Sequence, residues 1–303
     1  MIITPPYLEK GDTIGLVCPA GFMDEEKVEE CMRVLTEEWG YQVKKGKTIG
    51  GSSSTYFSGT DKERLADFQS MLDDPEVKAI LCARGGYGTS RIIDRIDFSH
   101  FRKKPKWIIG FSDITVLHCH IYRNFNIATL HAPMAGAFND AGYINRYVQS
   151  LRDALEGKWA RYSCEPHSFN RMGEGIGELV GGNLALLTHL MGSDSELKTK
   201  GRILFIEDVG EYLYNIDRMV LQLKRAGRLK NLAGLIVGGF SDTKDTERPF
   251  GKDVYEIIRD AVAEYDYPVC FGFPVSHEKE NLALKVGAGY KLKVSKSRVS
   301  LEE

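Results

Sequence analysis

The sequence has no long uninterrupted hydrophobic segment. No window of about 18 consecutive apolar residues occurs, whereas a helix that crosses a membrane needs about 20. The first residues, MIITPPYLEKGD, also lack the basic stretch followed by an apolar one that marks a signal peptide. These absences predict a cytoplasmic protein without a membrane partner.

An excess of one charge is also missing. The chain has 40 basic and 42 acidic residues, so its formal net charge is only -2. Proteins that bind polyanions usually carry a marked basic excess, because Lys and Arg must neutralise the phosphates. We therefore expect no nucleic-acid partner.

Metal-ligand spacings and cysteine pairs are absent as well. The six cysteines are scattered without a CxxC pair, and most lie in apolar runs where a thiol behaves as a small hydrophobic group. His118 and His120 are two residues apart on an expected helix, so they point to different faces and cannot easily share a metal. His131 ends an expected strand, where it could line a site or bond to the backbone. The sequence predicts neither a disulfide framework nor a metal site.

The order of apolar runs indicates an α/β protein. A chain of 303 residues exceeds what one core usually holds, so we expect two domains or one large α/β domain. In the first half, short apolar runs alternate with helical patterns, which predicts parallel strands joined by helices. The expected strands are residues 13–18, 41–46, 78–83, 106–111 and 126–133. The expected helices are residues 24–39, a helix from the capping-box pair Thr60 and Glu63 to about residue 73, and residues 143–156.

The second half has a different pattern. Residues 157–176 show little periodicity and are interpreted as a linker. Beyond them we expect helices at 184–191, 216–226 and 254–265, strands at 202–207 and 232–240, and a β-hairpin over 290–303, where polar and apolar residues alternate.

The motif GFSDIT places Ser112 where an apolar strand ends and a helix begins. It departs from the hydrolase pattern G-x-S-x-G only at Ile114. In one interpretation Ser112 is a nucleophile on a sharp turn, with the backbone amide of Asp113 facing an oxyanion. In the other, Ser112 is a helix N-cap and Asp113 follows it at the first helical position.

The loop ARGGYGTS follows another expected strand, and ligands of open α/β sheets bind beyond such carboxyl ends. Its consecutive glycines could wrap backbone amides around an anion or complete an oxyanion hole, and an ordinary tight turn is the alternative. Arg84 in this loop could pair with a substrate carboxylate or form a surface salt bridge.

Two further residues could complete a catalytic group. Glu207 ends a strongly apolar run and is followed at once by Asp208, and carboxylates seldom end a buried strand without a partner. His277 follows the apolar run 270–275. A serine nucleophile needs a base, and that base needs a carboxylate to fix its tautomer.

Several motifs together resemble a known family. The chain contains GDTIGLVCPAG, ARGGYG, GFSDIT, LHAPM, GGNL, LFIEDVGE, IDR and GFPVSH in this order. This order resembles that of the LD-carboxypeptidase family of serine peptidases, which includes the microcin C immunity proteins. Several ordered motifs across nearly the whole chain are far more specific than any single one. The segment SHEKEN has Ser276 before the histidine of the GHxxxN-like pattern, which bears on substrate preference.

The resemblance implies a site and an architecture. Ser112, Glu207 and His277 would form the catalytic triad, and the backbone amides of Asp113 and Gly86 would form the oxyanion hole. A flavodoxin-like or amidotransferase-like α/β domain (1–156) would carry the nucleophile. A mixed α/β domain with hairpin or barrel-like strands (177–303) would carry the other two residues, with the site between the domains. Homodimers are usual in the family, and neither a metal nor an organic cofactor is required.

The resemblance also implies a substrate, a murein tetrapeptide that loses its terminal D-alanine during cell-wall recycling. Arg84 is the candidate for gripping the terminal carboxylate. An immunity-type peptidase that cleaves peptidyl-adenylate or aminoacyl-adenylate analogues is the alternative. That branch tends to carry an aromatic-bearing loop before the glutamate, whereas GSDSELKTKG here is short and has no aromatic residue. A non-catalytic α/β protein that binds a small anion is a third possibility.

Overall fold

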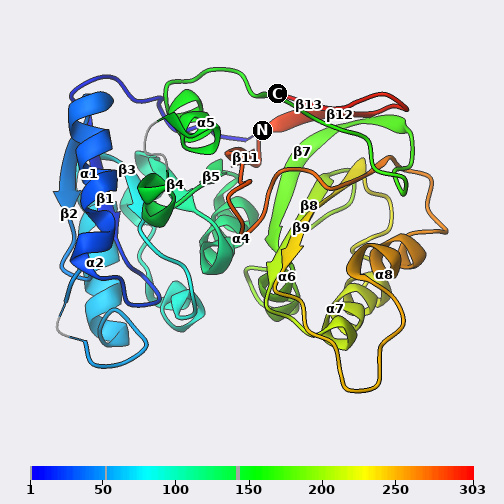
Figure 1. The fold of residues 1–303 in the computed structure, drawn as a ribbon. Helices are drawn as coiled ribbons and strands as arrows, with labels where there is room; N and C mark the ends of the chain where they lie inside the picture. Colours follow the sequence, from blue (N-terminus) through cyan, green and yellow to red (C-terminus); the bar gives the residue numbers. More distant parts are fainter. Residues whose placement is uncertain (1, 52, 141–143) are drawn as a thin grey trace. The chain divides into compact units, whose positions relative to one another are not determined.

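The computed structural model describes residues 2–51, 53–140 and 144–303 and divides the chain into two compact units. The first unit extends to Lys158 and includes the later segment Leu282–Val286. The second unit holds Trp159–Asn281 and Gly287–Glu303. Each unit contains one β-sheet with helices, as expected for the α/β class (Figure 1). No helix within the described ranges is long and apolar enough to span a bilayer.

The sheet of the first unit has the strand order β11-β5-β4-β3-β1-β2. Its strands are β1 (Thr13–Val17), β2 (Gln42–Lys45), β3 (Val77–Cys82), β4 (Trp107–Gly110), β5 (Thr129–His131) and β11 (Leu284–Val286). The first five strands are parallel, and their order 2-1-3-4-5 is that of the flavodoxin-like folds. Because the order reverses between β1 and β3, the loops after these two strands border the crevice in which such folds bind ligands.

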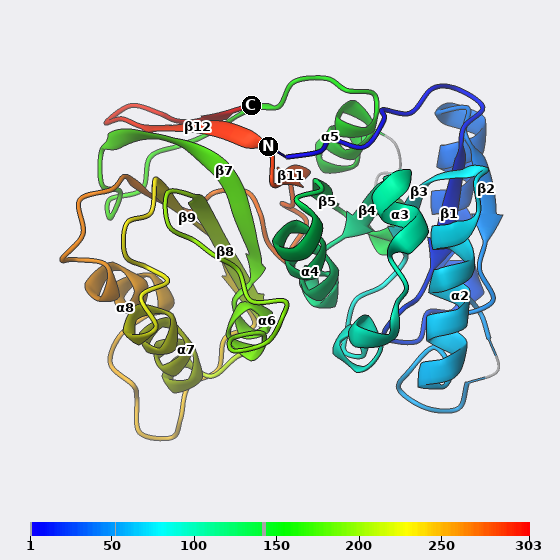
Figure 2. The same ribbon diagram turned by 180° about the vertical axis from the view of Figure 1, so that it is seen from behind.

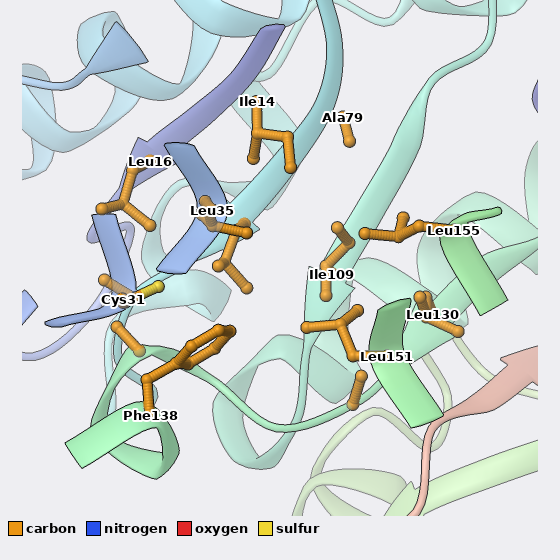
Figure 3. Packing of buried hydrophobic residues seen from close by; sticks show 14 of the residues in the cluster. Ile14, Leu16, Cys31, Leu35, Ala79, Ile109, Leu130, Phe138, Leu151 and Leu155 are labelled. Carbon is orange, nitrogen blue, oxygen red and sulfur yellow. The ribbon is translucent and has the colours of Figure 1, made fainter. Parts of the chain in front are cut away.

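Alternating strand residues fill the core of this unit. Ile14 and Leu16 of β1 belong to a buried cluster with Leu35, Phe138 and Leu151 (Figure 3). The other face is covered by α2 (Asp61–Asp73) and α4 (Thr115–Phe125), which Figure 2 shows in front of the strands. With both faces covered, the parallel strands β1, β3, β4 and β5 read as largely continuous apolar runs, which is why the sequence revealed them, whereas β2 is mostly exposed.

Two helices of this unit differ in detail from the prediction. The expected helix 24–39 is a 3-10 turn (Glu25–Val28), the short helix α1 (Glu29–Arg33) and a π-helical turn (Val34–Glu38). The amide of Trp39 bonds to the carbonyl of Val34, five residues back, and its ring is buried against Phe138. The helix expected from residue 143 is α5 (Arg146–Leu155), and residue 143 itself lies outside the described residues. The capping box of Thr60 and Glu63 at the start of α2 is confirmed.

The sheet of the second unit has the order β10-β9-β8-β7-β12-β13-β6. Its strands are β6 (Arg161–Cys164), β7 (Gly173–Asn183), β8 (Ile203–Val209), β9 (Gly234–Ser241), β10 (Val269–Phe271), β12 (Gly289–Val294) and β13 (Val299–Glu302). Strands β7 to β10 are parallel, whereas β12 and β13 form the expected antiparallel hairpin. The helices are α6 (Leu184–His189), α7 (Leu213–Arg225) and α8 (Val254–Ala261).

The region interpreted as a linker contains more regular structure than its sequence pattern indicated. Residues 157–176 include β6 and the first residues of β7. Strand β6 has four residues and β11 only three, so neither shows a recognisable alternation, and both are held by pairing with distant segments. Arg171, between β6 and β7, forms an isolated antiparallel bridge with Val269 in β10.

Candidate active site

Ser112 occupies a strained position between β4 and α4. Its φ of +61° lies in the left-handed region, which few residues other than glycine adopt. The 3-10 turn that begins here (Ser112–Ile114) has Phe111 as its N-cap and no side-chain cap bond. The alternative interpretation of Ser112 as a helix cap is therefore wrong. Strain of this kind costs about 1–3 kcal/mol and clusters at functional sites.

The glycine-rich loop after β3 packs directly against this turn. A Cβ atom added to Gly85 would lie 2.9 Å from the Cβ of Ser112 and 3.4 Å from the backbone nitrogen of Asp113. The carbonyl of Gly85 accepts a 3.0 Å bond from the amide of Gly21 in the loop after β1. Since a trans peptide directs its N–H opposite to its C=O, the amide of Gly86 points away from Gly21. The loop is thus in contact with the serine. This is expected, because β3 and β4 are parallel neighbours and the loops after them lie at the same edge of the sheet.

Asp113 ties the same loop to the turn from inside the protein. Its side chain is fully buried, and Oδ2 accepts a 2.8 Å bond from the amide of Thr89. Asp113 therefore fixes the end of the glycine-rich loop with its carboxylate, while its backbone amide lies beside Ser112.

Arg84 lies at the same edge of the sheet with an exposed side chain. Its guanidinium donates a hydrogen bond to the carbonyl of Phe22, and its Nε would lie 3.5 Å from a Cβ added to Gly21. No carboxylate in the described part of the chain forms an ion pair with it, so the salt-bridge interpretation finds no support there. One planar guanidinium has five N–H donors, and a single carbonyl leaves donors for a ligand.

Glu207 and His277 form a buried pair in the second unit. Oε2 of Glu207 lies 2.5 Å from Nδ1 of His277. The glutamate side chain is fully buried and that of the histidine is 13% exposed. Strand β8 carries Glu207, and a register shift in its pairing with β9 falls between Ile206 and Asp208. Such bulges are frequent beside active sites because they re-aim a side chain.

The carboxylates of β8 raise the pKa of His277. Burial favours the neutral ring and lowers this pKa, but the hydrogen bond to Glu207 and the charges of Glu207 and Asp208 together outweigh it, so the pKa lies above the ordinary value of 6.5. Burial also raises the pKa of Asp208 to about 6, even though Asn183, Ala185 and Val209 donate hydrogen bonds to it. Asn183 also caps α6. Its bond to Asp208, the residue after Glu207, therefore links the end of β8 to the start of α6.

Two adjacent glycines in β9 allow the histidine loop to approach. A Cβ added to Gly238 would lie 2.2 Å from the carbonyl oxygen of Val275, and one added to Gly239 would lie 2.6 Å from the Cβ of Ser276. The amide of Gly239 donates a 2.9 Å bond to the same carbonyl of Val275. Only glycine permits this spacing immediately before His277.

We expect Gly239→Ala to displace Ser276 and with it the ring of His277. Overpacking of this kind costs about 1–3 kcal/mol of unfolding free energy. Any activity that depends on His277 should fall further than stability explains, because a misplacement of about 1 Å can cost about 100-fold in rate. Thermal unfolding and activity measured together would test this. Gly289→Ala is the control, since nothing lies within 4 Å of the added methyl group; equal activity in both variants would contradict the prediction.

The three histidines first considered as metal ligands, His118, His120 and His131, make other contacts. Nε2 of His118 lies 2.8 Å from the carbonyl oxygen of Gly110, and burial lowers the pKa of this histidine to about 4. His120 stacks on Phe98, and His131 lies fully buried in β5. Within the described ranges no group of three His, Cys, Asp or Glu side chains could hold a metal.

The structure thus brings the predicted residues into two groups. Ser112, Asp113 and the glycine-rich loop with Arg84 meet in the first unit, and Glu207 meets His277 in the second. The contact of Gly85 with the serine and the glycine pair of β9 were not predicted from the sequence. The full burial of Arg64 on α2 was not predicted either. Arg64 shares a helical stripe with Phe68, Met71 and Leu72, and an arginine in an apolar stripe is the signal that could have revealed it.

Comparison with known proteins decides the family. The model of the LD-carboxypeptidase N-terminal domain matches residues 14–132, and the model of the C-terminal domain matches residues 176–292. The chain belongs to the LD-carboxypeptidase family. Its members are peptidases, which hydrolyse amide bonds, and the matched ranges include Ser112, Glu207 and His277.

Relatives of this member of the family are similar over nearly their whole length. A probable murein peptide carboxypeptidase of Bacillus subtilis is 39% identical, over 94% of this chain and 89% of the relative. A microcin C7 self-immunity protein of Escherichia coli is 26% identical, over 98% of this chain and 94% of the relative. The crystal structure of muramoyltetrapeptide carboxypeptidase from Oxalobacter formigenes has a TM-score of 0.86 and 26% identity, and the match covers 96% of this chain and 98% of that one.

Proposed function

We propose that the protein is a serine LD-carboxypeptidase that releases the terminal D-alanine of a murein tetrapeptide. The observation that carries the proposal is the buried hydrogen bond between Glu207 and His277 in a chain that also holds Ser112 on a strained turn. The names of the relatives from Bacillus subtilis and Oxalobacter formigenes support the murein substrate. We further propose that the enzyme is a cytoplasmic homodimer, as the family resemblance implies.

In the proposed reaction His277 is the general base. With Nδ1 held by Glu207, Nε2 takes the proton of the Ser112 hydroxyl as Oγ attacks the carbonyl carbon of the diamino acid. The C–N bond to D-alanine then breaks, and the proton passes from His277 to the leaving amine. Water then attacks the acyl-enzyme and gives a proton to His277. The bond to Oγ breaks, the tripeptide is released, and His277 returns the proton to Oγ of Ser112.

The oxyanion of the tetrahedral intermediate would be held by the backbone amides of Asp113 and Gly86. Three observations support this role. Asp113 follows the serine directly, the 85–86 peptide lies against the same serine, and its carbonyl is already engaged by Gly21, which fixes the direction of the amide. Donors fixed before the reaction stabilise the developing charge without reorganisation.

Arg84 is proposed to bind the terminal carboxylate of the substrate. Its exposed guanidinium belongs to the same loop as Gly86, and a carboxypeptidase must recognise a free carboxylate beside the scissile bond. An arginine can do so with two parallel hydrogen bonds.

The test is D-alanine release from a murein tetrapeptide by the purified protein. An otherwise identical peptide with an L-alanine terminus is the control for stereochemistry. We expect release from the D-terminal peptide alone. Hydrolysis of an aminoacyl-sulfamoyl or peptidyl-adenylate compound without D-alanine release would replace the murein substrate with the immunity-type one. Tight anion binding without any hydrolysis would support the non-catalytic alternative.

A further inference from the structure

A buried arginine lies behind the proposed oxyanion loop. The side chain of Arg64 on α2 has no exposed surface. A buried charge costs several kcal/mol unless hydrogen bonds and an opposite charge compensate it. Asp61, one turn earlier on the helix, supplies the charge through an ion pair with Nη2. The remaining N–H groups of the buried guanidinium must therefore also find hydrogen-bond acceptors.

Nε of Arg64 donates a 3.4 Å bond to the carbonyl of Gly59, just before α2, whereas the acceptors of Nη1 are backbone carbonyls of the two loops that meet at Ser112. Nη1 of Arg64 donates a 2.5 Å bond to the carbonyl of Pro19, in the loop after β1. The same nitrogen donates a 3.0 Å bond to the carbonyl of Gly88, at the end of the glycine-rich loop after β3. One guanidinium nitrogen thus joins the two loops at the reversal of strand order, where this fold class binds ligands.

The fit of the arginine against the glycine-rich loop is close. A Cβ added to Gly88 would lie 2.8 Å from Nη1 of Arg64, and Gly88 has a φ of +148°. The next residue, Thr89, is held by the carboxylate of Asp113. At the other end of the loop, the carbonyl of Gly85 is held by Gly21. The amide of Gly86 lies between these fixed points, so its position relative to Ser112 depends on them.

We propose that Arg64 is a positioning residue that sets the Gly86 amide for oxyanion binding by holding the Pro19 and Gly88 carbonyls together. The inference rests on the proposed function, because it assigns a role to the oxyanion hole of that same site. Arg64 does not touch the substrate in this scheme. Its effect is confined to the transition state, in which the carbonyl oxygen becomes negatively charged and needs the amide in place.

A purely structural arginine would give a different result from a positioning one. Loss of a structural anchor lowers stability and the amount of active protein. Loss of a positioning contact lowers kcat with KM unchanged and weakens tetrahedral analogues by the same factor, because ground-state binding does not use the oxyanion hole. Arg64→Lys keeps the positive charge but cannot reproduce the planar set of donors.

The experiment compares Arg64→Lys, Arg64→Ala and Gly88→Ala with the wild type. We expect about a 100-fold lower kcat with KM within about 2-fold of the wild type. Affinity for a peptide boronic acid, which forms a tetrahedral adduct with the serine, should fall by the same factor as kcat/KM. Guanidinium added at concentrations far below those that unfold the protein should partly restore Arg64→Ala and leave Ser112→Ala inactive. In Gly88→Ala the added methyl group would push the glycine-rich loop away from Arg64 while the arginine is still present. This variant therefore tests the inference if the arginine variants fold poorly.

Arg171→Lys is the matched control. Arg171 also donates to two backbone carbonyls, those of Val262 and Tyr267, but these belong to the second unit and not to the loops after β1 and β3. It should lose stability without a selective change in kcat. Folded Arg64 and Gly88 variants with wild-type kcat and boronate affinity would overturn the inference while leaving the proposed function intact. A wild-type protein that fails to release D-alanine would instead overturn the proposed function.

Discussion

Replacing Ser112 with alanine is expected to lower kcat for D-alanine release by roughly 10⁴-fold or more with the fold intact. The reason is that the proposed reaction passes through an acyl bond to Oγ, which alanine cannot form. His277→Ala should have a similar effect, and the double variant should be little worse than either alone, since triad members act as a unit. Steady-state D-alanine release would give these values.

Ser112→Gly separates the chemistry from the backbone strain. Glycine adopts a φ of +61° at little cost, so this variant should be about 1 kcal/mol more stable than the wild type and just as inactive as the alanine variant. Asn126→Gly is the control, because Asn126 at the end of α4 also has a positive φ, of 54°. It should change stability only slightly and leave activity at the wild-type level. An active Ser112→Gly enzyme would exclude Ser112 as the nucleophile.

Glu207→Gln is expected to lower kcat by roughly 10²- to 10⁴-fold and to move the pH profile. In the wild type the carboxylates outweigh burial and raise the pKa of His277, so kcat/KM should increase with pH through a value above 6.5. Glutamine has nearly the same shape but no charge. Burial then dominates the environment of the ring, and the acidic limb should move to lower pH as the maximal rate falls.

The pH dependence of kcat/KM for both enzymes would test this prediction. Glu211→Gln is a suitable control, because Glu211 lies near the end of the same strand but bonds to Asn215 instead of His277. Its profile should match that of the wild type. A Glu207→Gln profile with an unmoved acidic limb would mean that His277 is not the group that titrates.

The candidate side chains could be located from the sequence because each lies near or beyond the end of a strand. Ser112 comes after β4, Glu207 lies near the end of β8, and His277 follows β10. Apolar runs reveal strands, and carboxyl ends of parallel strands reveal where chemistry is placed. The structure adds the 2.5 Å contact between Glu207 and His277, which no spacing along the chain encodes, since 70 residues separate the two.

Features that depend on close packing could not be predicted in the same way. The contact between Gly85 and Ser112 arises because β3 and β4 are neighbours, and strand order is not a local property of the sequence. The apolar stripe around Arg64 indicates its burial, but its contacts could not be predicted, because their acceptors, the carbonyls of Pro19 and Gly88, carry no side-chain signal. The short strand β11 lacks alternation and is defined only by its pairing with β5.

Strand β11 has a consequence for the synthesis of the protein. It closes the edge of the sheet that carries Ser112, yet it is translated after His277. A nascent chain that has made only the first 158 residues therefore presents β5 as an open edge, which is a template for association with other chains. The sheet that carries Ser112 is completed only after His277 has been synthesised, so a truncated product would carry Ser112 on an unfinished and aggregation-prone sheet.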